Sequence, residues 1–188
     1  MLCKIKILFF VKGNKTVVLF LIKFFGTYLL LFLGYSYYLD KTQNETAPFA
    51  CAPITKTVAE QTKYLLNIFG YPTEIAQDTE TVSVELFING KLTAFIVEGC
   101  NAISIIILFI AFIVAFAGKF KTTVLYILFG SLLIYFTNIV RIFIISIALY
   151  EYPQYQHLLH EIIFPSIIYG MTFLLWFVWI RYFSNLKK

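Results

Sequence analysis

The chain has 188 residues, of which 60% are hydrophobic and 13% are charged. Soluble domains are about half apolar and about a quarter charged, so this composition excludes a soluble globular fold. Aromatic residues make up 19% of the chain, which suits lipid-facing helices and the interfacial belts of membrane proteins. The net charge is +5, but the basic residues form no cluster on a polar face, which indicates a membrane surface and no nucleic-acid partner.

Four segments approach the roughly 20-residue length of a membrane-spanning helix. We predict spans at 16–39, 101–117, 122–150 and 162–183. The first is not a signal peptide by its sequence, because it is longer than a signal core and no small-residue cleavage site follows it. The predicted fold is therefore an all-α integral membrane protein with about four transmembrane helices.

The distribution of charge predicts the orientation of these spans. Segments 1–15, 118–121 and 184–188 contain Lys and no acidic residue, whereas all Asp and Glu lie in loops 40–99 and 151–161. The positive-inside rule therefore places both termini and the short turn in the cytoplasm, and the two acidic loops outside. In a bacterium this means a multi-pass protein of the inner membrane whose outer loops face the periplasm.

The 40–99 loop is predicted to carry an extracytoplasmic helix and a β-hairpin. Apolar spacing predicts the helix over about 53–70, where a Gly and a Tyr-Pro pair stop it. The hairpin is predicted over about 82–97, because two β-rich runs flank Asn89-Gly90, and a type I′ turn needs positive φ at both central residues. The hairpin would deliver Cys100 to the mouth of the second span.

Three polar residues from different spans are expected at one depth in the membrane. Cys100, Arg141 and His160 each lie roughly 20 residues from the predicted inner end of their span, which is about 30 Å of helix. They can therefore converge near the outer membrane surface. A Cys thiolate is a nucleophile, a His transfers protons, and an Arg stabilises an oxyanion, so the trio suits acyl transfer by a thiol.

Other interpretations of these residues stay open at this point. Cys100 could form a disulfide with Cys51 on the same side of the membrane, or pack as a small apolar residue. Arg141 could extend to the outer headgroups. Asn138 precedes Arg141 by three residues on the same helical face, where it could bond Arg141 or a substrate, or pack between helices.

The histidines also allow a metal site to be considered. His157 and His160 share a helical face at three-residue spacing, and Glu161 is adjacent. The set is poor in further ligands, so we expect no metal. The chain has no phosphate-binding Gly loop and no haem motif, so we expect no bound cofactor.

Three motif blocks resemble the exosortase/archaeosortase family, in the family's order. They are Val97-Glu98-Gly99-Cys100-Asn101-Ala102, Asn138-Ile139-Val140-Arg141-Ile142, and His160-Glu161-Ile162-Ile163-Phe164-Pro165 with Tyr169-Gly170. The resemblance covers about residue 50 to the C-terminus, and the forms of the first and last blocks are closest to the exosortase F branch.

The resemblance implies a membrane cysteine transpeptidase or protease that cleaves the C-terminal sorting signal of exported proteins. Such a signal has a short motif, a transmembrane segment and a basic tail. The family's conserved residues match Cys100 as nucleophile, His160 as general acid and base, and Arg141 as the residue that stabilises the oxyanion. The family more often has a small hydroxyl residue and Gly after the Cys, where this chain has Asn101-Ala102.

Further site residues and partners follow from these interpretations. We expect Asn101, Asn138, His157 and Glu161 to bind substrate or support the site. Expected partners are exported proteins with a sorting signal, the lipid bilayer and a small membrane partner protein. Two other functions remain open: a non-catalytic scaffold or assembly factor for surface-protein export, and a thiol redox enzyme that uses two of the cysteines.

Overall fold

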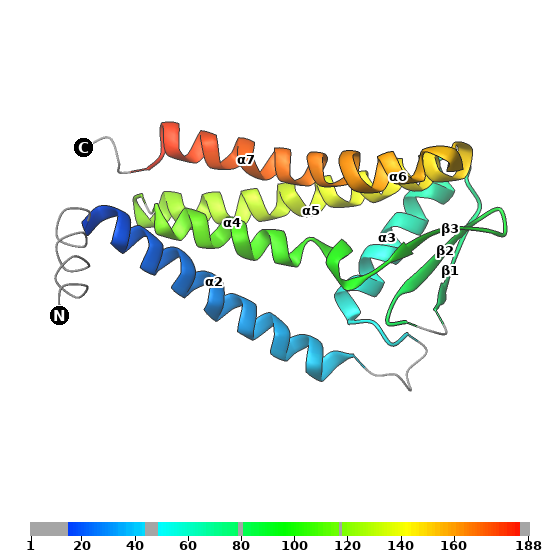
Figure 1. The fold of residues 1–188 in the computed structure, drawn as a ribbon, viewed down its shortest axis with the longest axis horizontal. Coiled ribbons are helices and arrows are strands. Elements are labelled where there is room, and N and C mark those ends of the chain that lie inside the picture. The colour runs from blue at the N-terminus through cyan, green and yellow to red at the C-terminus, as the bar shows by residue number, and fades with distance from the viewer. Residues whose placement is uncertain (1–14, 44–48, 79–80, 117, 185–188) are drawn as a thin grey trace, which may run out of the picture.

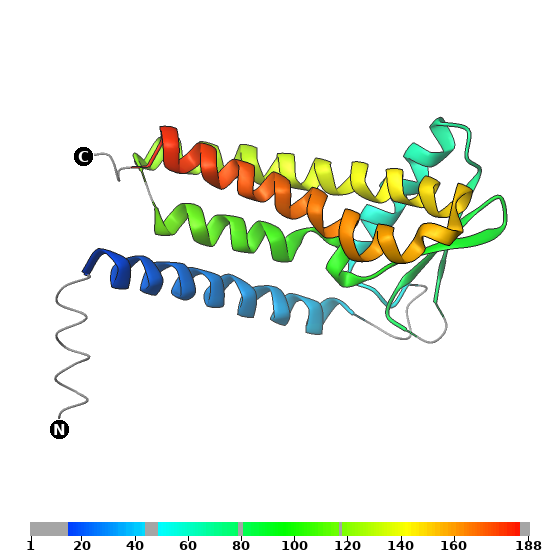
Figure 2. The same cartoon turned by 45° about the horizontal axis from the view of Figure 1, so that its top comes forward.

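The computed structural model describes residues 15–43, 49–78, 81–116 and 118–184, which form a helical bundle with a cap at one end (Figure 1). The helices of the bundle run alongside one another in both ribbon views (Figure 2). They are α2 (Lys15–Thr42), α4 (Ile103–Ala115), α5 (Phe120–Glu151) and α7 (Phe164–Tyr182). The cap consists of helix α3 (Pro53–Ile68) and a three-stranded sheet, so most of the described chain is helical.

Two helices of the bundle are long and apolar enough to cross a membrane. They are α2, over Val17–Thr42, and α5. Helix α4 has 13 residues, fewer than the roughly 20 that span a bilayer alone. It is short because the 3-10 turn η1 (Glu98–Asn101) and the left-handed residue Ala102 interrupt the helix before Ile103. The four-span arrangement therefore stays a prediction.

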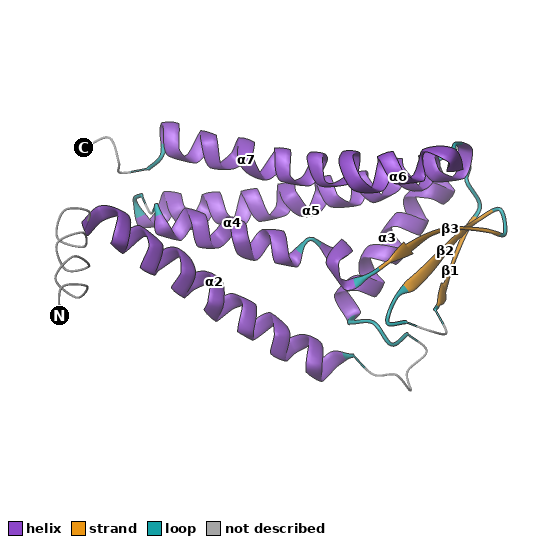
Figure 3. Ribbon diagram, in the orientation of Figure 1, coloured by secondary structure: helices purple, strands orange, loops and turns teal. Residues whose placement is uncertain are grey.

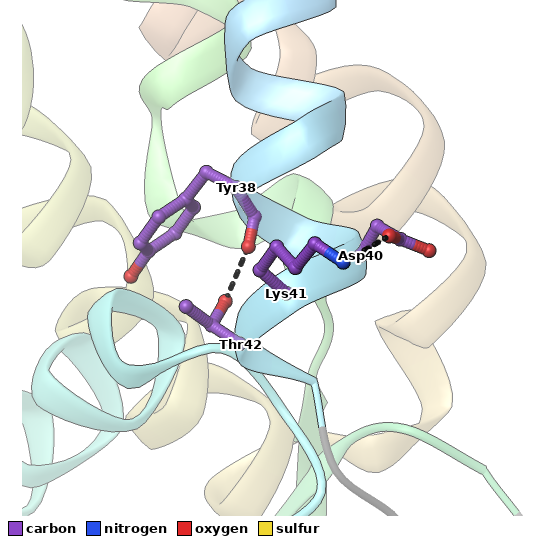
Figure 4. A network of polar contacts seen from close by, with 4 residues as sticks. All are labelled: Tyr38, Asp40, Lys41 and Thr42. Carbon is purple, nitrogen blue, oxygen red and sulfur yellow. Dashed lines mark hydrogen bonds and ion pairs between the residues drawn. The ribbon is translucent and has the colours of Figure 1, made fainter.

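The last turn of α2 is reinforced by a side chain (Figure 4). The hydroxyl of Thr42 donates to the carbonyl oxygen of Tyr38 at 2.8 Å. The ammonium of Lys41 lies 4.0 Å from the carboxylate of Asp40, and both side chains are exposed. An exposed ion pair of this kind contributes little stability, while a cation in the last turn favours the helix through its dipole.

The sheet has the strand order β1-β2-β3, with both pairs antiparallel. Its strands are β1 (Thr73–Gln77), β2 (Val84–Ile88) and β3 (Lys91–Ile96). The β2–β3 turn has φ of 51° at Asn89 and 75° at Gly90, the positive values that a type I′ turn needs. Strand β1 was not predicted from the sequence, because its residues are mostly polar or small and only pairing with β2 makes them a strand.

The molecule has two hydrophobic cores that share helix α5. The cap core contains Val58 and Leu66 of α3 and Leu86 of β2, together with Ile139 and Ile142 of α5. The bundle core contains side chains from α4, α5 and α7, which are Phe109, Ile113, Ile134, Ile168, Leu175 and Trp179. Helix α5 is unbroken, so it fixes the position of the cap relative to the bundle.

The 151–161 segment, predicted as a loop, is helical over most of its length. After Tyr152 the chain forms the 3-10 turn η2 (Pro153–Tyr155), helix α6 (Gln156–Leu158) and the π-helical turn η3 (Leu159–Ile163), which leads into α7. Pro165 explains the wide turn, because proline has no N–H to bond the carbonyl one turn earlier and its ring clashes with that carbonyl.

Gly130 of α5 allows a close approach to α4. A Cβ atom built at Gly130 would lie 2.3 Å from Cζ of Phe109, too close for any side chain. We predict that Gly130→Ala lowers the free energy of unfolding by about 1–3 kcal/mol through overpacking. The check is thermal unfolding in detergent, with Gly26→Ala in α2 as the control, since a Cβ there meets nothing within 4 Å. Equal melting temperatures for the two variants would contradict a tight α4–α5 contact.

Candidate active site

Cys100 lies in the 3-10 turn η1, between the end of β3 and the start of α4, where the two cores meet. Its backbone N–H donates to the carbonyl oxygen of Val97 at 2.8 Å, which closes the turn. Its side chain is partly buried and its thiol is free. The nucleophile predicted from the sequence is therefore held on a tight turn and not within a membrane helix.

The two residues after Cys100 start helix α4. Ala102 has φ of 64°, a left-handed conformation that costs a non-glycine residue about 1–2 kcal/mol. A glycine at this position would avoid that cost. Asn101 caps the helix, since its Oδ1 accepts from the backbone N–H of Ile103 at 3.0 Å. The backbone thus reverses directly after the thiol.

The carboxylate of Glu98 accepts hydrogen bonds from three parts of the fold. Its Oε1 accepts from the backbone N–H of Ala52 at 2.7 Å and from Nε2 of Gln43 at 3.1 Å. Its Oε2 accepts from the hydroxyl of Thr55 and from Nδ2 of Asn101, the latter at 3.3 Å. Glu98 therefore joins the turn that carries Cys100 to the chain after α2 and to α3.

This carboxylate also supplies the cap that α3 lacks. Ala52 is the N-cap residue of α3 and has no side chain to accept a hydrogen bond. A negative charge at a helix N-terminus is favourable, because the first N–H groups are unsatisfied and the dipole is positive there. Asn101 extends the network by donating to the Tyr35 hydroxyl of α2 at 2.7 Å. Three helices and the site turn are thereby held in one arrangement.

Helix α5 holds Cys100 from the other side. Nδ2 of Asn138 donates to the carbonyl oxygen of Cys100 at 2.6 Å. Arg141 follows Asn138 on the same helical face, and its side chain lies beside that of Cys100. Arg141 is 9% exposed, so it is turned into the protein and not toward the headgroups. Asn138 and Arg141 therefore contact the backbone and the thiol of the same residue.

Cys100 and Arg141 line a cavity of about 370 Å³ between β3 and α7. Most of its wall is apolar, and comprises Phe95, Val97, Gly99, Ile105, Pro165 and Ile168. Tyr169 of α7 completes the wall and was not predicted as a site residue. Its position one turn after Pro165, in the last motif block, is the signal that could have identified it. A thiol, a guanidinium and a phenol therefore face one apolar cavity.

The structure places the predicted histidines on the segment that leads to α7. His157 lies in α6, is exposed, and is not among the residues that line the cavity. The backbone of His160 and Glu161 lies in η3, five and four residues before Pro165. Their side chains lie outside the described residues, so the roles of His160 and Glu161 stay predictions. Among the described residues, no group of three His, Cys, Asp or Glu could hold a metal ion.

Cys51 is a free thiol buried in the cap core, so the two outer cysteines form no disulfide. Burial raises the pKa of the Cys51 thiol, and the nearby Glu98 carboxylate raises it further. A raised pKa lowers the thiolate fraction at a given pH, and the thiolate is the nucleophile. Cys51 is therefore unsuited to redox exchange with Cys100 in the folded state.

We predict that N-ethylmaleimide at pH 8 labels Cys100 at least tenfold faster than Cys51 in the folded protein. The buried Cys51 thiol holds little thiolate at this pH, whereas Cys100 faces a cavity. Mass spectrometry of digested protein measures both rates, and Cys51→Ala identifies the Cys100 adduct. Unfolding in denaturant should equalise the two rates. Equal rates in the folded protein would contradict the burial of Cys51.

A second prediction concerns Glu98. We expect Glu98→Ala to cost about 1–3 kcal/mol or more of stability, because Ala52 N–H and the buried Thr55 hydroxyl lose their acceptor. Glu98→Gln keeps one acceptor oxygen and should cost less. Thermal unfolding measures both variants, with the exposed Glu74→Ala as the control. A Glu98→Ala variant as stable as the control would show that the carboxylate does not hold the turn.

The chain matches a known family over most of its length. The family model described as transmembrane exosortase (Exosortase_EpsH) matches residues 1–179. No curated protein and no solved structure matches the chain. Exosortases are in general membrane cysteine transpeptidases. Since the match leaves only the last residues uncovered, the protein belongs to the transmembrane exosortase family.

Proposed function

We propose that this exosortase cleaves a C-terminal sorting signal of exported proteins through a thioester acyl-enzyme, and transfers them to a surface acceptor. The observation that carries the proposal is that the side chains of Arg141 and Cys100 lie side by side on the wall of a mostly apolar cavity. A fixed positive charge beside the attacking sulfur can stabilise the negative charge that develops during the reaction. An apolar wall excludes water, which strengthens that interaction.

The proposed reaction has two steps. In the first, the Cys100 sulfur attacks the carbonyl carbon of the scissile peptide bond, and His160 takes the thiol proton. The C–N bond then breaks, His160 protonates the leaving amine, and a thioester remains on Cys100. In the second, a nucleophilic group of the acceptor attacks the thioester carbonyl while His160 takes its proton. The C–S bond then breaks, and the released Cys100 thiolate recovers the proton from His160.

Arg141 is assigned to the charge that develops in both steps. Each attack converts a carbonyl oxygen into an oxyanion, and a preorganised donor aimed at that oxygen lowers the barrier. Arg141 is buried on a continuous helix, and its neighbour Asn138 is bonded to the Cys100 carbonyl. The guanidinium therefore needs little reorganisation when the substrate carbonyl arrives at the sulfur.

The proposed membrane orientation brings the sorting signal to this cavity. The α4–α5 turn and the end of α7 lie at one end of the bundle, and the cap lies at the other (Figure 1). Basic residues mark the first end, where Lys119, Lys121 and Arg181 lie. With that end in the cytoplasm of a bacterial inner membrane, the cavity faces the periplasmic side. A substrate with a basic cytoplasmic tail would then present its motif beside Cys100.

The test is processing of exported proteins in cells that carry wild type, Cys100→Ala or Cys51→Ala. Loss of the nucleophile should reduce cleavage to background, so cargo with an intact C-terminal segment accumulates. Cys51→Ala is the matched control and should leave cleavage in place, since Cys51 does not line the cavity. Intact-mass analysis of cargo C-termini measures the outcome. Unchanged cleavage in Cys100→Ala cells, with the variant inserted in the membrane, would overturn the proposal.

A further inference from the structure

Strand β3 connects the cap directly to the proposed nucleophile. It ends at Ile96, and the chain enters the turn that carries Cys100 two residues later. It is also an edge strand, because the sheet order is β1-β2-β3. One row of its backbone N–H and C=O groups therefore points away from β2, and an edge of this kind can pair with another extended chain.

The two ends of β3 differ in how far they discourage such pairing. At the turn end lies Lys91, whose ammonium is 5.9 Å from the centroid of the Tyr150 ring. The same end has a register irregularity in its pairing with Leu86 and Phe87 of β2. A charge and a bulge are the usual means of blocking an edge. The end near Cys100 has neither, since Ala94 to Val97 are uncharged and pair regularly with β2 up to Ile96.

At the end of β3 near Cys100, a buried side chain alternates with exposed apolar side chains. Ile96 is 1% exposed and packs in the cap core. Its neighbours Phe95 and Val97 are 51% and 44% exposed and line the cavity that contains Cys100. An apolar surface that is exposed beside a strand edge, and that is continuous with a proposed active site, is typical of a surface to which a partner binds.

We propose that the free edge of β3 binds the substrate by strand addition, with the segment that precedes the scissile bond running parallel to β3. This inference rests on the proposed function and specifies how its substrate binds. Backbone hydrogen bonds to the edge would supply affinity, and alternate side chains of the peptide would enter the apolar cavity and supply specificity. The cavity therefore favours small or apolar residues just before the cleaved bond.

The direction follows from the geometry of the chain. Strand β3 runs from the β2–β3 turn toward the bundle, where it meets η1 (Figure 3). In the proposed orientation the folded part of an exported protein lies outside, beyond the cap, and its transmembrane segment lies beside the bundle. Its chain must then travel from the cap toward the membrane, the same direction as β3. A parallel strand places the scissile carbonyl at Cys100 and the following segment at the lipid.

Site-specific photo-crosslinking tests both the surface and the direction. The photoreactive residue p-benzoylphenylalanine replaces Leu92, Phe95 or Val97 in Cys100→Ala cells, and exported proteins with a C-terminal membrane segment are the probe. Leu92 is 42% exposed and lies on the same face of the sheet as Phe95, since their partners on β2 are Phe87 and Glu85. The same replacement of the exposed Glu74 on β1, at the opposite edge, is the matched control.

The expected result is an ordered set of adducts in the residues just before the cargo's membrane segment. Val97 should react nearest that segment, Phe95 farther upstream and Leu92 farthest, with less than a tenth of the yield from Glu74. Adducts in the reverse order, adducts equal to those of Glu74, or no adduct from any of the three positions would overturn the inference. Because all three side chains are exposed, three independent replacements guard against one that fails to fold.

The same cells separate this inference from the proposed chemistry. Ordered adducts together with continued cleavage in Cys100→Ala cells would support docking at β3 and overturn Cys100 as nucleophile. Loss of cleavage with adducts in the wrong order or place would support the nucleophile and overturn docking at β3.

Discussion

The rest of the structure depends on the hydrogen bonds that the Glu98 carboxylate accepts. They join the turn that carries Cys100 to the N-terminus of α3, and through Asn101 to α2. Without them α3 would begin with an uncapped end beside a buried hydroxyl and amide. One carboxylate thus stabilises the cap and at the same time sets the place of the proposed nucleophile, two residues along the chain. Buried polar groups of this kind must all be satisfied together, which gives the site a single geometry.

Helix α5 provides the complementary constraint. It contributes Ile134 to the bundle core and Ile139 and Ile142 to the cap core, so it cannot shift in one core without disturbing the other. Asn138 and Arg141 lie at the level where its neighbours change from bundle to cap. The charge proposed to stabilise the oxyanion is therefore carried by a helix that both cores hold in place. The proposed substrate strand, in contrast, would bind at the outer edge of the sheet, next to a cavity.

Several structural features could be predicted from local sequence, and several could not. The turn at Asn89-Gly90 has the predicted positive φ values because that turn type depends on its two central residues alone. Cys100 and Arg141 lie at similar sequence distances from the predicted inner ends of their spans, which predicts a similar height because helix rise converts sequence distance into height; both residues line one cavity in the structure. Strand β1 was not predicted, because its residues form a strand only when they pair with β2. The wide turn before Pro165 was not predicted, because hydrophobic periodicity assumes a regular α-helix. The place of Tyr169 in the cavity wall was not predicted either, because periodicity does not show which neighbouring helix or strand a helix face contacts.

The sequence by itself determined the class of protein and the family, because composition and short motifs are local properties. Its charge distribution and motifs also supplied the predicted membrane orientation and the candidate site residues. Only the tertiary structure decided how those residues are held. It placed Cys100 on a 3-10 turn before α4, turned Arg141 inward, buried Cys51 in the cap core as a free thiol and set β3 at a sheet edge. These features depend on hydrogen bonds and packing between segments as far apart as Gln43 and Glu98 or Cys100 and Asn138. Such contacts arise from the simultaneous satisfaction of buried polar groups and of two cores, which no local pattern encodes.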